Sequence, residues 1–140
     1  MQQLAQAIAR DGEGATCLIE VQVEGAVDEA TALQVARTVC GSSLVKTAVH
    51  GRDPNWGRIV AAAGRSGVSF DPDAVALWIG PYQLMAAGQP VAFDRAAASN
   101  VLRQEHVSIR LGLGHGSGSG QAWGCDLSDQ YVRINADYTT

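Results

Sequence analysis

The feature that most constrains the fold is an alternating segment near the N-terminus, "LIEVQVE", residues 18–24. Apolar side chains stand at Ile19, Val21 and Val23, and the residues between them are glutamate or glutamine. Successive side chains of a strand point to opposite faces, so this alternation predicts a strand with one buried face and one polar face. Such a strand needs another layer against its apolar side. The chain is therefore expected to fold around a sheet that is covered on one face.

Segments with helical and strand-like spacing alternate along the rest of the chain. Helices are expected over residues 2–10, 28–41, 55–67 and 94–105, with Asp28 and Asp94 as N-caps. Strands are expected over residues 74–80, 82–88, 106–114, 121–127 and 130–136, most of them paired across short turns. Residues 42–51 are expected to form a short strand or a turn. The pattern predicts an α+β fold of two layers, with helices on one face of a largely antiparallel sheet. Its other face is expected to need a partner.

Length, charge and cysteine usage limit the classes of function. The 140 residues contain no repeat and no linker, so residues 1–140 are expected to form a single domain. The net charge is −4 and Lys46 is the only lysine, which disfavours nucleic acid and anionic membranes as partners. No apolar run approaches the roughly 20 residues that span a bilayer, and no signal peptide is recognisable. Three cysteines without C-x-x-C spacing fit buried thiols in a reducing cytoplasm.

Glycines and histidines offer only weak signals. The segment "GHGSGSG", residues 114–120, matches neither the dinucleotide-binding nor the P-loop spacing, so a mobile hairpin connection is favoured over a phosphate site. His50, His106 and His115 lie far apart in the sequence, and a packed or solvated imidazole is the default interpretation for each. No G-x-S-x-G motif and no zinc-ligand spacing is found, so no metal site is expected.

The segment "GRDPNWGR", residues 51–58, is denser in informative residues. Asp53 precedes a proline, and proline fits the first position of a helix, so Asp53 is the expected N-cap. Trp56 is expected to fasten the start of this helix to the core. The segment is either a well-built helix start or a site at which N–H groups and an arginine bind a carboxylate. Residue chemistry alone favours the structural interpretation.

Two further segments leave the same choice open. Glu13 lies between two glycines in "DGEGAT", although turns usually use Asp or Asn, which bond their own backbone. A glutamate there is either part of a turn or a carboxylate aimed at a ligand ammonium. The last residues, "INADYTT", carry polar side chains directly after an expected strand. They are either a solvated tail or part of a binding site.

Four segments, in this order, are together similar to one protein family: "DGEGAT", "LVKTAVHGRDPNWGRIVAAAGRSG", "AWGCDLS" and "YVRINADYTT". The chain resembles the C-terminal part of the β chain of ornithine acetyltransferase, the bifunctional glutamate N-acetyltransferase of arginine biosynthesis. The resemblance covers nearly all 140 residues. Its specific motifs are "DPNWGR" and the closing "NADY-x-T".

The resemblance implies a defined chemistry. In this family a precursor cleaves itself before a threonine, and that threonine takes the acetyl group from N-acetylornithine and passes it to glutamate. Some members also accept acetyl-CoA as a donor, and no other cofactor is implied. The resulting α and β chains form a cytoplasmic heterotetramer. The implied substrate-binding residues are Glu13, Asn135 and Thr140, and the candidate supporting residues are Asp53, Asn55 and Arg58.

The sequence departs from the family pattern in one important respect. The nucleophilic threonine and its flanking motif are not found in it, and Cys17 stands where the family often has a lysine. No catalytic residue is therefore expected within this chain, and the chain alone is expected to be inactive. The alternative is a non-catalytic domain of the same fold that binds a small molecule or a protein partner.

Overall fold

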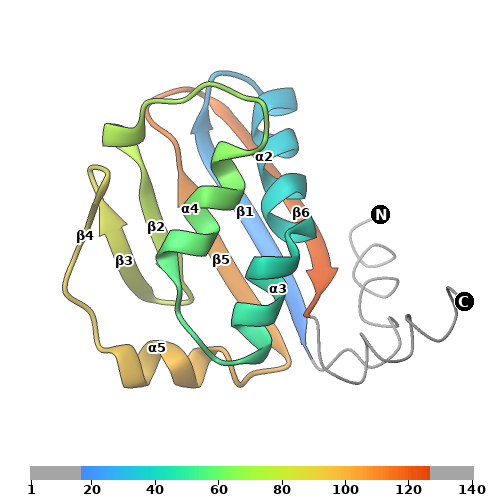
Figure 1. The fold of residues 1–140 in the computed structure, drawn as a ribbon. Helices are drawn as coiled ribbons and strands as arrows, with labels where there is room; N and C mark the ends of the chain where they lie inside the picture. Colours follow the sequence, from blue (N-terminus) through green and yellow to red (C-terminus); the bar gives the residue numbers. More distant parts are fainter. Residues whose placement is uncertain (1–16, 127–140) are drawn as a thin grey trace, which may run out of the picture.

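The computed structural model describes residues 17–126 of the chain (Figure 1). The expected helix at 2–10 and the expected strand at 130–136 lie outside these residues. The elements follow the order β1 (Leu18–Ala26), α2 (Glu29–Gly41), α3 (Ser43–His50), α4 (Trp56–Gly64), a short 3-10 helix η1 (Pro72–Ala74), β2 (Ala76–Ile79), β3 (Tyr82–Ala86), β4 (Gln89–Pro90), α5 (Arg95–Val101), β5 (His106–Gly112) and β6 (Gly118–Cys125).

The strands form a six-stranded sheet in the order β4-β3-β2-β5-β1-β6. The pair β1–β5 is parallel, and the other paired strands are antiparallel. In this register Val21 of β1 lies between Ile109 of β5 and Ala122 of β6. The expectation of a largely antiparallel sheet is therefore confirmed.

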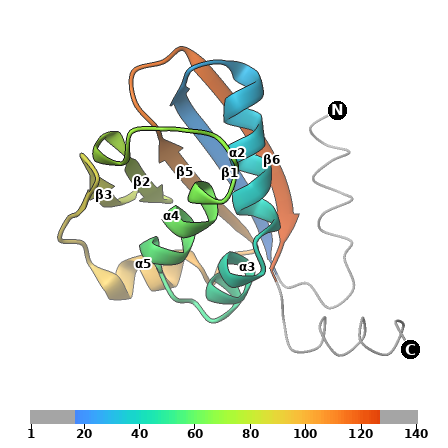
Figure 2. The same ribbon diagram turned by 45° about the horizontal axis from the view of Figure 1, so that its top comes forward.

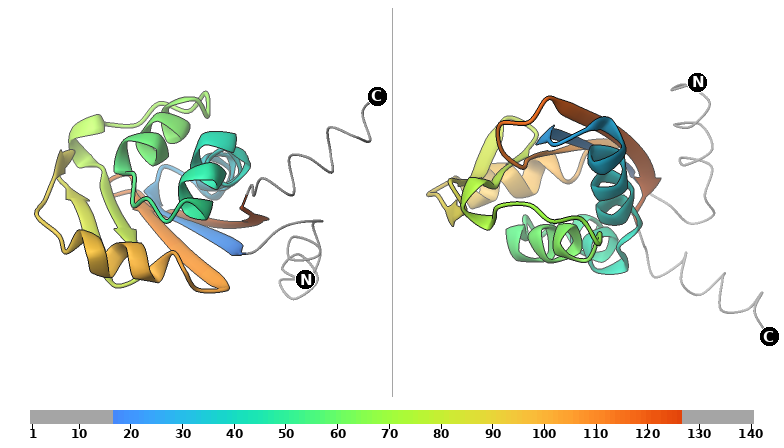
Figure 3. Two further views of the ribbon diagram at one scale, coloured as in Figure 1. Left: turned by 60° about the horizontal axis from the view of Figure 1, so that its bottom comes forward. Right: turned by 90° about the horizontal axis from the view of Figure 1, so that it is seen from above.

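Helices α2, α3 and α4 lie together on one face of the sheet, as Figure 3 shows from below and from above. Helix α5 lies at the end of the sheet near the β2–β3 turn, which the turned view of Figure 2 makes clear. Both predicted N-caps are confirmed. The Asp28 carboxylate accepts a hydrogen bond from the Thr31 N–H at 2.7 Å, and the Asp94 carboxylate accepts one from the Ala97 N–H at 3.0 Å. The two-layer α+β prediction is confirmed.

The segment that was expected to be a strand or turn is a helix. Residues Ser43–His50 form α3, and the Ser42 hydroxyl caps it by accepting a hydrogen bond from the Val45 N–H. Val45, Ala48 and Val49 are its buried residues, and their spacing of three and four is that of one helical face. The prediction of a short strand or a turn was therefore wrong: the helical spacing of the apolar residues decides the structure here, against the β propensity of valine.

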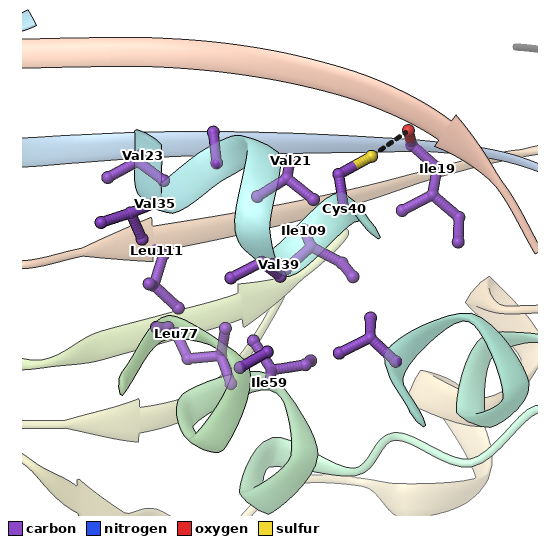
Figure 4. Close-up of a cluster of buried hydrophobic side chains, with 14 of the residues drawn as sticks. Ile19, Val21, Val23, Val35, Val39, Cys40, Ile59, Leu77, Ile109 and Leu111 are labelled. Atoms are coloured by element: carbon purple, nitrogen blue, oxygen red, sulfur yellow. Dashed lines mark hydrogen bonds between the residues drawn. The ribbon is translucent and has the colours of Figure 1, made fainter. Parts of the chain in front are cut away.

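The core lies between the sheet and the helical layer (Figure 4). Ile19, Val21 and Val23 are completely buried and point toward α2 and α4, as the alternation predicted. Val39 of α2 and Ile59 of α4 close the cluster from the helical side. One continuous apolar cluster therefore joins the parallel strand pair to both of these helices.

The opposite face of the sheet is polar and carries its own charge pairs. His106 Nε2 lies 3.0 Å from the Glu20 carboxylate, and the Arg110 guanidinium lies 4.2 Å from the centre of the Trp78 ring. Arg110 also lies 3.8 Å from the Glu24 carboxylate. The expectation that this face needs a partner stays a prediction, and any partner would meet a polar, charge-paired surface.

The glycine-rich segment after β5 is partly strand. Gly118 and Gly120 belong to β6 and point toward the first turns of α2, where a Cβ on Gly118 would lie 2.1 Å from the Asp28 carbonyl oxygen. At Gly120 a Cβ would lie 2.8 Å from the Leu33 nitrogen. These glycines therefore allow β6 to approach α2 closely, and the prediction of a mobile hairpin connection was wrong for this half of the segment.

Candidate functional site

The predicted site residues fall into two groups. The expected substrate-binding residues Glu13, Asn135 and Thr140 lie outside the described residues, so their roles stay predictions. Their segments adjoin the two ends of the described fold at Cys17 and Asp126. The candidate supporting residues Asp53, Asn55 and Arg58 are described.

Asn55, not Asp53, caps helix α4. The Asn55 side-chain oxygen accepts a hydrogen bond from the Arg58 N–H at 3.0 Å, and α4 begins at Trp56. Asp53 lies one residue before Pro54, so the proline precedes the cap instead of opening the helix. The predicted N-cap was therefore wrong by two residues. Trp56 is 37% exposed, so the expectation that it fastens the helix start to the core was also wrong.

Asp53 instead links this loop to α5. Its carboxylate accepts hydrogen bonds from Arg95 Nη2 at 2.9 Å and from Asn55 Nδ2 at 3.1 Å. The Arg52 carbonyl, at a residue with φ of 56°, accepts a hydrogen bond from the Ser99 hydroxyl at 2.8 Å. Both side chains of the Asp53–Arg95 pair are exposed (36% and 68%), so the pair contributes at most about 1 kcal/mol.

The "DPNWGR" loop is therefore held in place by its own polar side chains. Arg58 Nη1 donates to the Leu44 carbonyl of α3 at 3.2 Å, so α4 is tied to α3 as well. A hollow of ≈ 510 Å³ lies beside the loop, and two arginines, Arg52 and Arg95, line it. Arg95 already donates to the Asp53 carboxylate, so one of the two guanidinium groups is paired within the chain. Binding of a ligand carboxylate in this hollow stays a prediction.

We expect Asn55→Ala to lower the free energy of unfolding by about 1 kcal/mol, because the Arg58 N–H loses its acceptor at the start of α4. Urea denaturation monitored by circular dichroism measures this change. The matched control is Asn55→Ser, which keeps an oxygen acceptor at the cap without adding a carboxylate beside Asp53, and it should cost clearly less than Asn55→Ala. A stability of Asn55→Ala equal to that of the parent would remove Asn55 from the role of cap.

The two ends of the described fold meet at a buried carboxylate. Asp126 is 0% exposed and accepts a hydrogen bond from the Cys17 N–H at 2.9 Å. The Asp126 N–H in turn donates to the Cys17 carbonyl at 3.2 Å. The other Asp126 oxygen lies 2.9 Å from Nδ1 of His50, the last residue of α3. With an ionised carboxylate, His50 donates this hydrogen bond, so we assign its proton to Nδ1.

This contact brings three of the sequence motifs to one point. Cys17 follows "GEGAT", His50 precedes "GRDPNWGR", and Asp126 belongs to "AWGCDLS". The beginning of β1, the end of β6 and the C-terminal end of α3 lie close together in Figures 1 and 2. Sequence analysis missed both residues of the pair. The available signal was that His50 and Asp126 lie within two of the four segments that resemble the family.

The other described parts of the chain give weaker support for a binding site. A groove of ≈ 760 Å³ runs along β6 and α2, and its charged lining residues, among those described, are Glu24 and Glu29. Two acidic groups disfavour a phosphate there. Within residues 17–126, no cluster of three or more potential ligands could hold a metal ion. In the same part of the chain, no helix has the length and apolar character needed to cross a bilayer.

The three cysteines are buried, as expected, and no disulfide joins them within the described fold. Burial raises the pKa of the Cys40 thiol to about 11, against a smaller opposing effect from Lys46. Cys40 is therefore a protonated thiol at neutral pH and donates to the Ile19 carbonyl (Figure 4). A nucleophilic role for Cys40 is disfavoured, because the thiolate is the reactive form.

Comparison with known proteins gives a consistent result. A family model described as "ArgJ family" matches residues 1–140. A protein of Parasynechococcus marenigrum (strain WH8102) named arginine biosynthesis bifunctional protein ArgJ is 79% identical over the whole chain, which covers 34% of its length. A protein of Citrullus lanatus named arginine biosynthesis bifunctional protein ArgJ, chloroplastic, is 59% identical over the whole chain, which covers 32% of its length.

A solved structure has the same fold. The crystal structure of arginine biosynthesis bifunctional protein ArgJ from Bacillus halodurans superimposes with a TM-score of 0.94 at 47% sequence identity. The match covers 98% of this chain and 65% of that one. The chain spans about a third of the length of the curated relatives that it matches.

Proposed function

The chain belongs to the ArgJ family, and from this premise we propose that it is the C-terminal part of an acetyltransferase of arginine biosynthesis. The complete protein moves an acetyl group from N-acetylornithine to glutamate. The names of the relatives support arginine biosynthesis, and the four sequence motifs support this reaction. In this proposal the chain supplies substrate-binding residues, and transfer requires the rest of the protein.

The proposed reaction has two steps. A threonine oxygen attacks the acetyl carbonyl of N-acetylornithine, and the C–N bond breaks with proton transfer to the departing ornithine amine. The glutamate amine then attacks the acetyl-threonine ester, which releases N-acetylglutamate and regenerates the threonine. Acetyl-CoA is an alternative donor for the first step. Self-cleavage of a precursor into α and β chains, their assembly into a heterotetramer and a cytoplasmic location remain part of the proposal.

The observation that best supports a binding role for this chain is the meeting of Cys17 and Asp126. Glu13 lies four residues before Cys17, and Asn135 lies nine residues after Asp126. The two segments that carry the expected ligand-binding residues therefore leave the described fold from one point. Two segments that are far apart in the sequence but adjoin the fold at one point can both contribute to a single binding site, as the proposed reaction requires.

Activity of a complete protein tests the proposal. We define the complete protein as the Parasynechococcus marenigrum relative with this chain in place of the third that it matches. The expected result is transfer of a labelled acetyl group from N-acetylornithine to glutamate, with a labelled threonine ester trapped after a rapid acid quench. A folded complete protein that transfers no acetyl group from either N-acetylornithine or acetyl-CoA would contradict the proposal and favour the non-catalytic alternative.

We expect Glu13→Ala in the complete protein to lower kcat/KM, because a charge-assisted contact to a ligand or to the nucleophile's amine is lost. Such contacts contribute about 1.5–3 kcal/mol, which is about a tenfold to 150-fold change in rate. Steady-state kinetics with both substrates measure it. The matched variant Glu13→Gln keeps a hydrogen-bonding group without the charge. Its kcat/KM should lie between that of the parent and that of Glu13→Ala. Kinetics of Glu13→Ala equal to those of the parent would remove Glu13 from the site.

A further inference from the structure

The two edges of the sheet differ in how well they are protected against another strand. At one edge, β4 has only two residues, Gln89–Pro90, and proline has no N–H to offer. At the other edge, β6 has eight residues without a proline or a charged side chain (Figure 1). Edge strands of natural proteins commonly avoid unwanted pairing through short length, proline or charge. Because β6 has none of these three features, its open edge suits pairing with another strand.

One row of backbone groups on β6 faces away from β1. The Asp126 N–H donates to the Cys17 carbonyl, and every second residue of an antiparallel strand bonds to the same neighbour, so the even-numbered residues of β6 face β1. The N–H and C=O groups of Ser119 and Trp123 therefore point toward the open edge. Among the strands of residues 17–126, β1 alone pairs with β6. An added strand would find these groups at the spacing of a normal ladder.

Charged side chains stand at both ends of this open edge. Where β6 begins, Glu24 and Glu29 line the groove that runs along β6 and α2. Glu24 lies 3.8 Å from Arg110, whereas no ion pair of Glu29 is described within residues 17–126. Where β6 ends, Lys46 of α3 lies close by, since a Cβ on Gly124 would be 3.9 Å from Lys46 Cε. The edge is therefore acidic at one end and basic at the other.

Helix α2 shows the same order of charge along its side next to β6. Glu29, Leu33 and Arg37 are spaced by four residues, so they share one side of the helix. This side adjoins β6, because both Glu29 and Leu33 line the groove. Leu33 is half-buried, while Glu29 and Arg37 are exposed. The order acidic, apolar, basic becomes complementary to itself when a second copy is turned end to end.

We propose that β6 pairs in antiparallel fashion with β6 of a second copy of this chain, so that the two sheets become one. The start of each strand then lies beside the end of the other, and Glu29 of each copy meets Arg37 and Lys46 of its partner. A parallel pair would bring the two Glu29 side chains together and is disfavoured. A two-fold interface uses one patch that complements itself, as this edge does. The inference concerns this chain alone and does not depend on acetyl transfer.

Sedimentation velocity of the chain over a wide concentration range tests the proposal. The expected result for the parent is an equilibrium between monomer and dimer. Ser119→Pro removes an N–H at the open edge and leaves the bonds to β1 in place, so it should weaken dimerisation about 100-fold, because each dimer loses two such donors. The matched control is Ser119→Ala, which keeps the N–H and should dimerise as the parent does. Circular dichroism checks that both variants fold.

An exchange of charges tests the antiparallel geometry without changing the strand. Glu29→Arg and Arg37→Glu should each weaken dimerisation about 10-fold, since each creates two like-charge contacts per dimer. Combined in one chain, the two substitutions restore opposite charges across the two-fold axis and should recover most of this loss. The control is Arg103→Glu, a charge reversal just after α5, which should leave the dissociation constant within about twofold of the parent.

Three results would overturn this inference. They are a chain that stays monomeric at every concentration, a dimer that Ser119→Pro leaves unchanged, and effects of Glu29→Arg and Arg37→Glu that merely add in the combined variant. A monomeric chain that instead binds the remaining two-thirds of the Parasynechococcus marenigrum relative, and loses this binding with Ser119→Pro, would assign the edge to a segment of that protein. If Ser119→Pro fails to fold, the exchange of charges decides alone.

Discussion

Ile109→Ala is expected to lower the free energy of unfolding by about 2–5 kcal/mol. Ile109 stands on β5, between the strands β1 and β2, where it is paired with Val21 and with Ile79. All three side chains are buried, and the helical layer closes over them (Figure 4). Truncation leaves a cavity. The strands on both sides of β5 are held by hydrogen bonds and cannot move in to fill it, so the loss of unfolding free energy should lie toward the upper part of this range.

Two substitutions serve as controls for Ile109→Ala. Ile109→Val removes a single methyl group and should cost about 0.5–1.5 kcal/mol. Val27→Ala truncates a side chain that is 76% exposed and should stay within about 0.5 kcal/mol of the parent. Urea denaturation of the chain, followed by circular dichroism, measures all three. A loss below 1 kcal/mol for Ile109→Ala would contradict its place at the centre of the core.

Gly25→Ala is expected to destabilise the chain by about 2–5 kcal/mol, from two additive causes. Gly25 has φ of 73°, a conformation that costs a non-glycine residue about 1–2 kcal/mol. A Cβ at this position would also lie 2.2 Å from the carbonyl oxygen of Gly114, and overpacking typically costs about 1–3 kcal/mol. The obstacle is backbone, which cannot rotate away as a side chain can.

Gly67→Ala separates the two causes. Gly67 has φ of 79°, but the nearest atom to a Cβ there is Gln34 Nε2 at 3.6 Å, an ordinary contact. Only the conformational cost of about 1–2 kcal/mol should remain. A third variant, Gly64→Ala, places a methyl group in open space within α4 and should be neutral or stabilising. Equal losses for Gly25→Ala and Gly67→Ala would show that the close approach of Gly114 is unimportant.

Periodicity in the sequence predicted the strands well and the short helix α3 poorly. The alternation from Ile19 to Val23 identified β1 because a half-buried strand repeats every two residues. Helix α3 has eight residues, too few for its helical period to stand out against the β propensity of valine. Its cap, Ser42, was overlooked for the same reason.

The choice of cap at α4 depends on tertiary contacts. Asp53 and Asn55 are both good N-cap residues, and they stand two positions apart. Asp53 is held by Arg95 of α5, which leaves Asn55 to cap the helix. Arg95 is far away in the sequence, so no local rule could have identified the cap.

The candidate site was predictable only in part. The binding roles of Glu13 and Asn135 come from the family resemblance, since residue chemistry alone favoured a turn and a solvated tail, and they stay predictions. The His50–Asp126 contact joins residues 76 positions apart, and neither residue has a neighbour that signals its partner. His50 ends α3 and Asp126 follows β6, so their contact depends on how these two elements pack, which becomes known only with the fold.

The place of β1 in the sheet also determines when the chain can fold. Its two neighbours, β5 and β6, are the last strands of the described fold. Leu18 can therefore form its pairs with His106 and Cys125 only after both of these strands have been made. Contacts between such distant residues require the closure of long loops, and they slow folding. During synthesis, β1 therefore emerges from the ribosome long before either partner exists. The apolar face of β1 lacks both neighbouring strands over that interval, and among the described elements α2 is the first that can cover it against aggregation.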